Sequence, residues 1–272
     1  MRQAAGLAAS QPRAMGRARI GLRDGRLADL YQQGSARIML PIAPGPGLEA
    51  VIVNTAGGIT GGDRFAYEGH AQGGRLVLAT QTAERLYRAQ PGQIGRLETS
   101  LTVAPGARID WLPQETIVFD RAALDRRLSV SLRGDAVFTA VEPLILGRAA
   151  MGETLHQAHV TDHWEIRRNG ALVYAEAFRL TGDIQAATRG PGTLAGHRAF
   201  ATLLHLGPDA ASLLAPLRNA LGQAHTVLGG ASLRDGCLIA RLVAPDGLAL
   251  RRGLAQALPC LLGRPLPRVW QI

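Results

Sequence analysis

The feature that most constrains the fold is a period-two alternation of apolar and polar residues, carried by short segments separated by glycine, proline and aspartate. In "RLSVSLR", Leu128, Val130 and Leu132 alternate with arginine and serine, and "RLETSLTV" at residues 96–103 has the same pattern. Successive side chains of a strand point to opposite faces, so this alternation is typical of half-buried strands. The sequence therefore predicts a β-rich chain.

The predicted strands cover most of the sequence. In "HWEIRRNGALVYAEAFRL", Asn169 and Gly170 separate two alternating runs, which predicts a hairpin with a two-residue turn. We interpret the pattern as one mainly β domain at residues 25–272, preceded by a flexible N-terminal tail at residues 1–24. Further strands are expected near residues 36–42, 48–54, 64–70, 74–80, 107–119, 135–146, 199–206 and 237–243.

Helical periodicity is confined to the C-terminal third of the chain. The segment "PDAASLLAPLRNALGQ" offers Asp209 as a cap and places its leucines on one helical face, although Pro216 weakens its first turns. The segment "DGLALRRGLAQALPCLLG" is the second predicted helix, and we expect it to end near Pro259. A few helices therefore accompany the β domain.

The composition excludes several classes of enzyme. All 30 basic side chains are arginine, and the formal net charge is +9. Without lysine there is no P-loop lysine, no Schiff base and no Ser-Lys dyad. The sequence has no signal-peptide pattern and no apolar run of the roughly 18 residues that a membrane span needs. We expect a soluble, cytoplasmic protein.

Three glutamates share a strand phase with large apolar residues, which predicts that they point inward. They are Glu176 in "LVYAEAFRL", Glu115 in "WLPQETIVF" and Glu142 in "AVFTAVEPLIL". A buried carboxylate is costly unless it is paired or coordinates a cation. Two interpretations stay open: internal Glu–Arg pairs, or a polar lane through which a divalent cation passes, since oxygen ligands exchange readily.

The segment "HQAHVTDH" gathers three of the seven histidines, and its meaning depends on conformation. On a helix, His156, His159 and His163 would share one face at a spacing compatible with a metal. On a strand, which the following "WEIRRNGALVY" favours, His159 and His163 point to the polar face and His156 to the other. A surface pair of histidines is then the default interpretation, and a dedicated metal site at these three histidines stays open as the alternative.

The glycine-rich segment "NTAGGITGGDR" at residues 54–64 resembles a phosphate loop only superficially. A dinucleotide fingerprint opens a helix, whereas the residues that follow this segment alternate like a strand. Paired glycines between two strands fit positive-φ turn positions or a close approach of backbones. We therefore interpret the segment as a turn that positions Asp63.

Several of these segments together resemble one family of proteins. The series "GGITGGDR", "LATQTAERLYR", "WLPQETIVFDRA", "RRNGALVYAEAFRL" and "GRPLPRVW" is similar to the urease accessory protein family UreD, called UreH in some organisms. The resemblance runs from about residue 25 to the C-terminus in the order of the family.

The resemblance implies a β-rich, superhelical, β-helix-like scaffold that is not an enzyme and acts in the cytoplasm. Such proteins bind apo-urease and recruit UreF and, through it, the GTPase UreG, in a dimeric assembly built with UreF. Nickel passes through an internal channel as cargo, and no cofactor is tightly bound. The positions that match family motifs, and that are candidates for lining such a channel, are Asp63, Thr80, Glu115, Glu142, Glu153 and Glu176.

Two other functions remain open from the residues alone. Buried glutamates could serve as general acid and base in an enzyme, which requires two carboxylates at one accessible pocket. The positive charge could serve nucleic-acid binding, which requires a concentrated basic face. The arginines are scattered and there are only 12 aromatic residues, so nucleic-acid binding is the least supported of the three functions considered.

Overall fold

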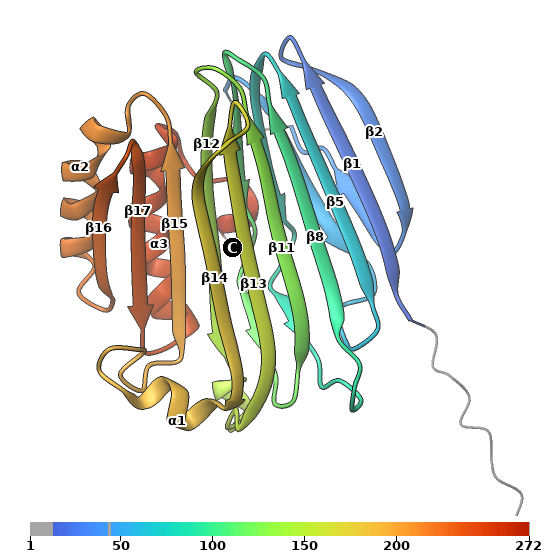
Figure 1. Ribbon diagram of the computed structural model, residues 1–272, viewed down its shortest axis with the longest axis vertical. Coiled ribbons are helices and arrows are strands. Elements are labelled where there is room, and N and C mark those ends of the chain that lie inside the picture. The colour runs from blue at the N-terminus through green and yellow to red at the C-terminus, as the bar shows by residue number, and fades with distance from the viewer. Residues whose placement is uncertain (1–12, 43–44, 272) are drawn as a thin grey trace, which may run out of the picture.

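The chain winds back and forth between two stacked β-sheets (Figure 1). The computed structural model of the protein describes residues 13–42 and 45–271. Between two neighbouring parallel strands of one sheet, the chain crosses to the other sheet and returns. Strand β6, for example, lies in the second sheet and connects β5 to β8 of the first. This repeated crossing makes a flattened superhelix, and it confirms the predicted mainly β, β-helix-like fold.

The first sheet, sheet A, has the strand order β14, β13, β11, β8, β5, β1, β2. All neighbours from β1 to β13 are parallel, while β2 and β14 are antiparallel strands at the two edges. The strands are β1 Met15–Arg23, β2 Arg26–Gly34, β5 Arg64–Gln72, β8 Gly95–Val103, β11 Ala123–Leu132, β13 Gln157–Arg168 and β14 Ala171–Asp183.

The second sheet, sheet B, has the order β16, β17, β15, β12, β9, β6, β4, β3. Its strands β4, β6, β9 and β12 are parallel, and the short strand β10 joins β12 to β7 beside this path. The strands are β3 Ala36–Met39, β4 Leu48–Asn54, β6 Gly74–Thr80, β7 Glu84–Leu86, β9 Ala107–Leu112, β10 Thr116–Val118, β12 Val137–Leu146, β15 Ala199–Leu206, β16 Leu228–Arg234 and β17 Cys237–Ala244.

The alternation in the sequence produces the main core between the sheets. Strand β8 alternates buried and exposed residues along its whole length, and its inward leucines pack with residues of sheet B such as Trp111 and Phe138. The predicted hairpin is confirmed, since Asn169 and Gly170 adopt φ values of 50° and 84° between β13 and β14. Both residues take the left-handed conformation that a tight two-residue turn requires.

Three helices follow in the C-terminal third. Helices α2 Ala210–Gln223 and α3 Gly247–Leu262 lie at the two predicted segments, whereas α1 Ile184–Arg189 was not predicted. Short 3-10 turns lie at Ala149–Met151 and Arg268–Trp270. Helices α2 and α3 pack on the outer face of sheet B (Figure 1), where Leu217 and Leu254 join a second core with residues such as Val141. Sheet B therefore has a core on each face.

The prediction that the second helix ends near Pro259 is wrong. Helix α3 includes Pro259 and continues to Leu262, where Gly263 ends it with φ of 60°. The Gly263 amide donates to the Pro259 carbonyl oxygen at 2.9 Å, so the last turn closes with a left-handed cap. Asp209 does stand at the N-cap position of α2, but its side chain makes no capping hydrogen bond.

Two further expectations need correction. The flexible tail expected at residues 1–24 contains strand β1, which pairs in parallel with β5. The strand forms because Ala18, Ile20 and Leu22 alternate with other residues and bury their side chains in the core. Residues 1–12 lie outside the described part of the chain. The strand expected at 107–119 is two strands, β9 and β10, because Pro113 has no backbone N–H to continue the ladder.

Candidate metal route between the sheets

Polar side chains interrupt the apolar core at one level between the two sheets. A cavity of about 30 Å³ lies there, lined among others by Thr80, Glu84, Thr116, Arg126 and Glu142. A cavity needs about 10–15 Å³ to hold one water molecule. This space is therefore large enough for a water or a small ion, and two of the predicted site residues, Thr80 and Glu142, share it.

The centre of the polar row is an arginine held between two acids. Arg126 of β11 donates from Nη1 to the carboxylate of Glu142 on β12, in the opposite sheet, and from Nη2 to Asp162 Oδ2 on β13 at 2.7 Å. All three side chains are almost fully buried, at 6–7 % exposure. Burial raises the pKa of Glu142, and the neighbouring guanidinium of Arg126 opposes that rise.

One end of the row reaches solvent through Glu176 on the edge strand β14. Its carboxylate accepts hydrogen bonds from Tyr174 and from Thr202 Oγ1, the latter at 3.2 Å, and pairs with Arg241 at 3.2 Å. The Glu176 side chain is 17 % exposed, whereas that of Arg241 is 62 % exposed. Thr202 stands directly opposite Glu142 in the β12–β15 register and donates to Glu176, so it lies between the central acid and the outer one.

The other end of the row is Glu84 on β7. Asn54 Nδ2 donates to its carboxylate at 3.1 Å and also to the carbonyl oxygen of Gly58 at 3.0 Å. Burial raises the pKa of Glu84 to about 7, and the nearby Asp63 charge adds to that rise. The glycine-rich turn thus lies beside this end of the row.

Asp63 itself holds the glycine-rich turn together. Its Oδ2 accepts from the Thr60 amide and its Oδ1 from the Ala14 amide, each at 2.8 Å, and the residue is only 5 % exposed. Both carboxylate oxygens are therefore engaged by backbone. The turn does position Asp63, but the side chain points into the turn and the N-terminal segment.

Glu115 and Glu153 lie away from the cavity. Glu115 is buried, but it pairs at 2.8 Å with Arg251 on α3, which covers the outer face of sheet B. The period-two phase does not carry from Trp111 to Glu115, because the break at residues 113–115 interrupts the strand. Glu153 accepts from the guanidinium of Arg148, which holds the pKa of Glu153 below its usual range.

The histidine segment forms a strand, as its surroundings predicted. His159 and His163 lie on β13, with His159 exposed and His163 Nδ1 4.0 Å from Asp125 Oδ1, while His156 precedes the strand. Across the described ranges, no three His, Cys, Asp or Glu side chains gather closely enough to hold a metal ion. His159 instead lines an open surface groove together with Arg88 and Arg121.

Four residues of the row were not predicted from the sequence: Glu84, Arg126, Asp162 and Thr202. The signal for two of them was present. Arg126 shares its phase with Leu124 and Leu128, and Asp162 shares its phase with Val160 and Trp164. The criterion used for the three glutamates was a shared strand phase with large apolar residues. Applied also to arginine and aspartate, it identifies Arg126 and Asp162. Glu84 gives no such signal, because its strand has only three residues.

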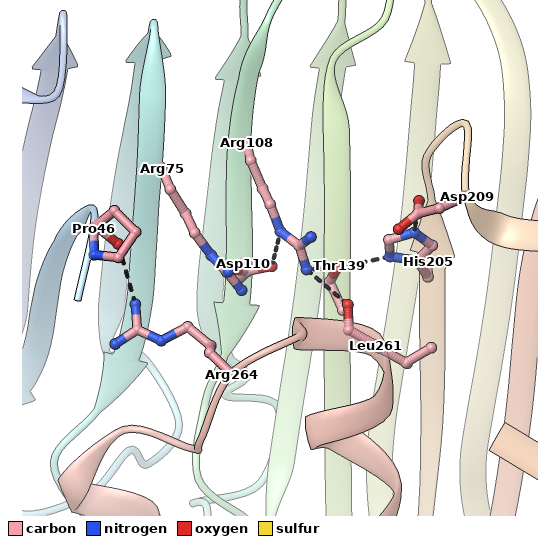
Figure 2. A network of polar contacts seen from close by, with 9 residues as sticks. All are labelled: Pro46, Arg75, Arg108, Asp110, Thr139, His205, Asp209, Leu261 and Arg264. Atoms are coloured by element: carbon pink, nitrogen blue, oxygen red, sulfur yellow. Dashed lines mark hydrogen bonds and ion pairs between the residues drawn. The ribbon is translucent and has the colours of Figure 1, made fainter. Parts of the chain in front are cut away.

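A second buried network lies on the outer face of sheet B, under α3 (Figure 2). Asp110 accepts from Arg75 Nε at 2.6 Å and from Arg108 Nε at 2.8 Å, and Arg108 also donates to the carbonyl oxygen of Leu261 on α3. Thr139 and His205 continue the network to Asp209 through contacts of 2.9 Å. The network fixes the end of α3 and the start of α2 to the sheet.

These features define the class of protein: a flattened β-solenoid with a row of buried acids and arginines between its sheets and with helices packed on one outer face. Within the described residues, no helix is both long and apolar enough to cross a membrane.

The profile of the family "UreD urease accessory protein" matches residues 14–271. The chain is 48 % identical over 261 residues to a "Urease accessory protein UreD" of Chelativorans sp. strain BNC1, covering 94 % of this chain and 93 % of that protein. It is 43 % identical over 265 residues to the UreD of Azorhizobium caulinodans, covering 96 % and 97 % of the two chains. The chain belongs to the UreD family of urease accessory proteins, which supports urease maturation.

Proposed function

We propose that this chain is a non-catalytic metallochaperone scaffold that binds apo-urease and, together with UreF and UreG, allows nickel to reach the urease active site. It does so in the cytoplasm, within a dimeric assembly formed through UreF. Nickel is its cargo, and the polar row between the sheets is the route for that cargo. The observation that carries the proposal is the series Glu84, Glu142, Thr202 and Glu176. The first two line one cavity, Glu142 and Thr202 are opposite in register, and Thr202 donates to Glu176.

The chemistry of this row suits a cation in transit. Carboxylate and hydroxyl oxygens bind divalent transition-metal ions less tightly than thiolates or imidazoles do. The ion therefore dissociates quickly from each oxygen ligand. The row begins at Glu84 beside the glycine-rich turn and ends at Glu176, whose partner Arg241 is exposed to solvent. A cation therefore has oxygen ligands along the interior and an outlet at one edge of sheet A.

The two other candidate functions receive less support. A pocket for a drug-sized ligand measures roughly 300 Å³ or more, whereas the cavity beside Glu142 measures about 30 Å³. Acid–base catalysis on such a molecule has no room there. As for nucleic acid, internal pairs with carboxylates occupy several of the arginines that produce the net charge, among them Arg75, Arg108 and Arg126.

The proposal is tested by co-expressing urease with its accessory proteins, with and without this chain. We expect omission to lower both the nickel content of urease and its activity. Unchanged nickel and activity would contradict the proposed function.

The route is tested by Glu176→Ala. We expect less nickel in urease, with the complex of accessory proteins still co-purifying, because the substitution removes ligands at the outlet only. Glu98→Ala is the matched control, since Glu98 is an exposed glutamate on the outer face of sheet A. Loss of assembly, or normal nickel loading, would instead make Glu176 part of a structural ion pair.

A further inference from the structure

Each of the three glutamates that were predicted to point inward is bound by an arginine. Glu115 pairs with Arg251, Glu142 with Arg126, and Glu176 with Arg241. A guanidinium fills the lone pairs of a carboxylate and repels a second cation. In the conformation described, the row therefore offers a divalent ion no free carboxylate at Glu142 or Glu176.

The central pair differs from the other two because the arginine lies between two acids. Arg126 carries one positive charge, while Glu142 and Asp162 together carry two negative charges when ionised. Arg251 and Arg241 each face a single glutamate and are partly exposed, at 21 % and 62 %. A divalent cation would balance the two acids completely, which the single guanidinium does not.

Two buried atoms of this cluster have no hydrogen-bond partner among the described residues: Asp162 Oδ1 and Arg126 Nε. The Asp162 side chain is 7 % exposed, and its other oxygen already accepts from Arg126 and from Trp164 Nε1. Unpartnered buried polar atoms are rare, and a bound water or ion is one of the explanations for them. Arg126 and Glu142 also line the cavity of about 30 Å³, which has room for a water ligand.

We propose that Glu142 and Asp162 form a divalent-cation site, closed in this conformation by Arg126, which acts as an internal counter-ion. The proposal rests on the proposed function, because nickel is the cation that the route would carry. Arginine stays protonated at any physiological pH, so the site cannot open by loss of a proton. It opens only when the guanidinium moves away. Arg126 and Asp162 both lie on sheet A, so a change in the conformation of the Arg126 side chain would open the site and leave the two acids in place.

The test is Arg126→Met, which keeps an unbranched side chain and removes the guanidinium and its charge. Purified wild-type and variant protein are dialysed against Ni²⁺, and bound metal is counted. We expect the variant to bind one equivalent more than wild type, and Ni²⁺ to raise its midpoint of thermal unfolding. Both gains should disappear in the double variants with Glu142→Gln or Asp162→Asn.

Arg251→Met is the matched control, because it frees the single carboxylate of Glu115 and should create no additional equivalent. Arg126→Gln, which keeps a hydrogen-bond donor, is a second variant with the same expectation if Arg126→Met folds poorly. The proposal is overturned if neither Arg126 variant gains Ni²⁺, or if the additional equivalent persists after Asp162→Asn.

This result is separate from the test of the proposed function. If Arg126→Met gains Ni²⁺ but omission of the chain leaves urease unchanged, the cation site is supported and the proposed function is contradicted. If omission of the chain lowers urease activity but neither Arg126 variant gains Ni²⁺, the proposed function is supported and the closed cation site is contradicted.

Discussion

Arg251 on helix α3 donates to both carboxylate oxygens of Glu115, at 2.8 and 3.0 Å, and so joins the helical layer to sheet B. The two residues lie 136 positions apart in the sequence. The same arginine stacks 5.2 Å from the ring of Trp270 near the C-terminus. The pair therefore connects the sheet, the last long helix and the end of the chain.

Glu115→Ala should lower the free energy of unfolding by about 2 kcal/mol. Breaking a buried ion pair costs about 3–5 kcal/mol, and the loss is smaller here because Arg251 is partly exposed and can regain water. Urea unfolding measures the change. Glu98→Ala, on the exposed face of β8, should change stability by less than about 0.5 kcal/mol. Equal effects of the two substitutions would mean that the pair contributes nothing.

Glu84→Gln should make the protein more stable at high pH. Burial raises the pKa of Glu84 from 4.5 to about 7, so the folded state binds a proton that the unfolded state has released across this range. The contribution of Glu84 is full below pH 4.5 and is lost as the pH rises through 7. The stability of the variant relative to wild type should therefore increase across this window, by roughly 2–3 kcal/mol. Parallel stability curves of variant and wild type would refute the expectation.

His205 should produce the opposite dependence on pH. Its side chain is fully buried between Thr139 and Asp209 (Figure 2), and burial lowers its pKa below the ordinary 6.5. The contribution is therefore present above pH 6.5 and is lost as the pH falls through the lowered pKa. Denaturant unfolding at pH 7.5 and 5.5 should show less acid sensitivity in His205→Gln than in wild type. His225→Gln, at an exposed histidine, should keep the wild-type sensitivity.

Two neighbouring glycines of the turn should respond differently to alanine. A Cβ at Gly58 would lie 2.3 Å from Tyr87 Cε2 and 2.6 Å from the carbonyl oxygen of Arg85, whereas a Cβ at Gly57 meets nothing within 4 Å. Gly57→Ala should cost only the strain of its φ of 78°, about 1 kcal/mol, while Gly58→Ala should cost at least about twice as much. Thermal unfolding of both variants measures the difference, and similar midpoints would contradict the packing argument.

The sequence by itself determined most of the architecture. Alternation along segments such as residues 96–103 predicts strands whatever lies opposite them, because the pleat alone sets which side chains share a face. Asn169 and Gly170 predict their turn from backbone conformation alone. The phase of Glu142 correctly predicted an inward carboxylate. These features depend on residues close together in the chain.

Only the tertiary structure decided which side chain pairs with each buried carboxylate. Phase says that Glu142 points inward, but the register of β11, β12 and β13 and the stacking of the two sheets bring Arg126 and Asp162 to it. The same holds for Glu115, where the break at Pro113 ended the phase and α3 supplied Arg251. A period-two pattern fixes the face of a strand, whereas a contact between sheets depends on where distant segments stack, which no local pattern encodes.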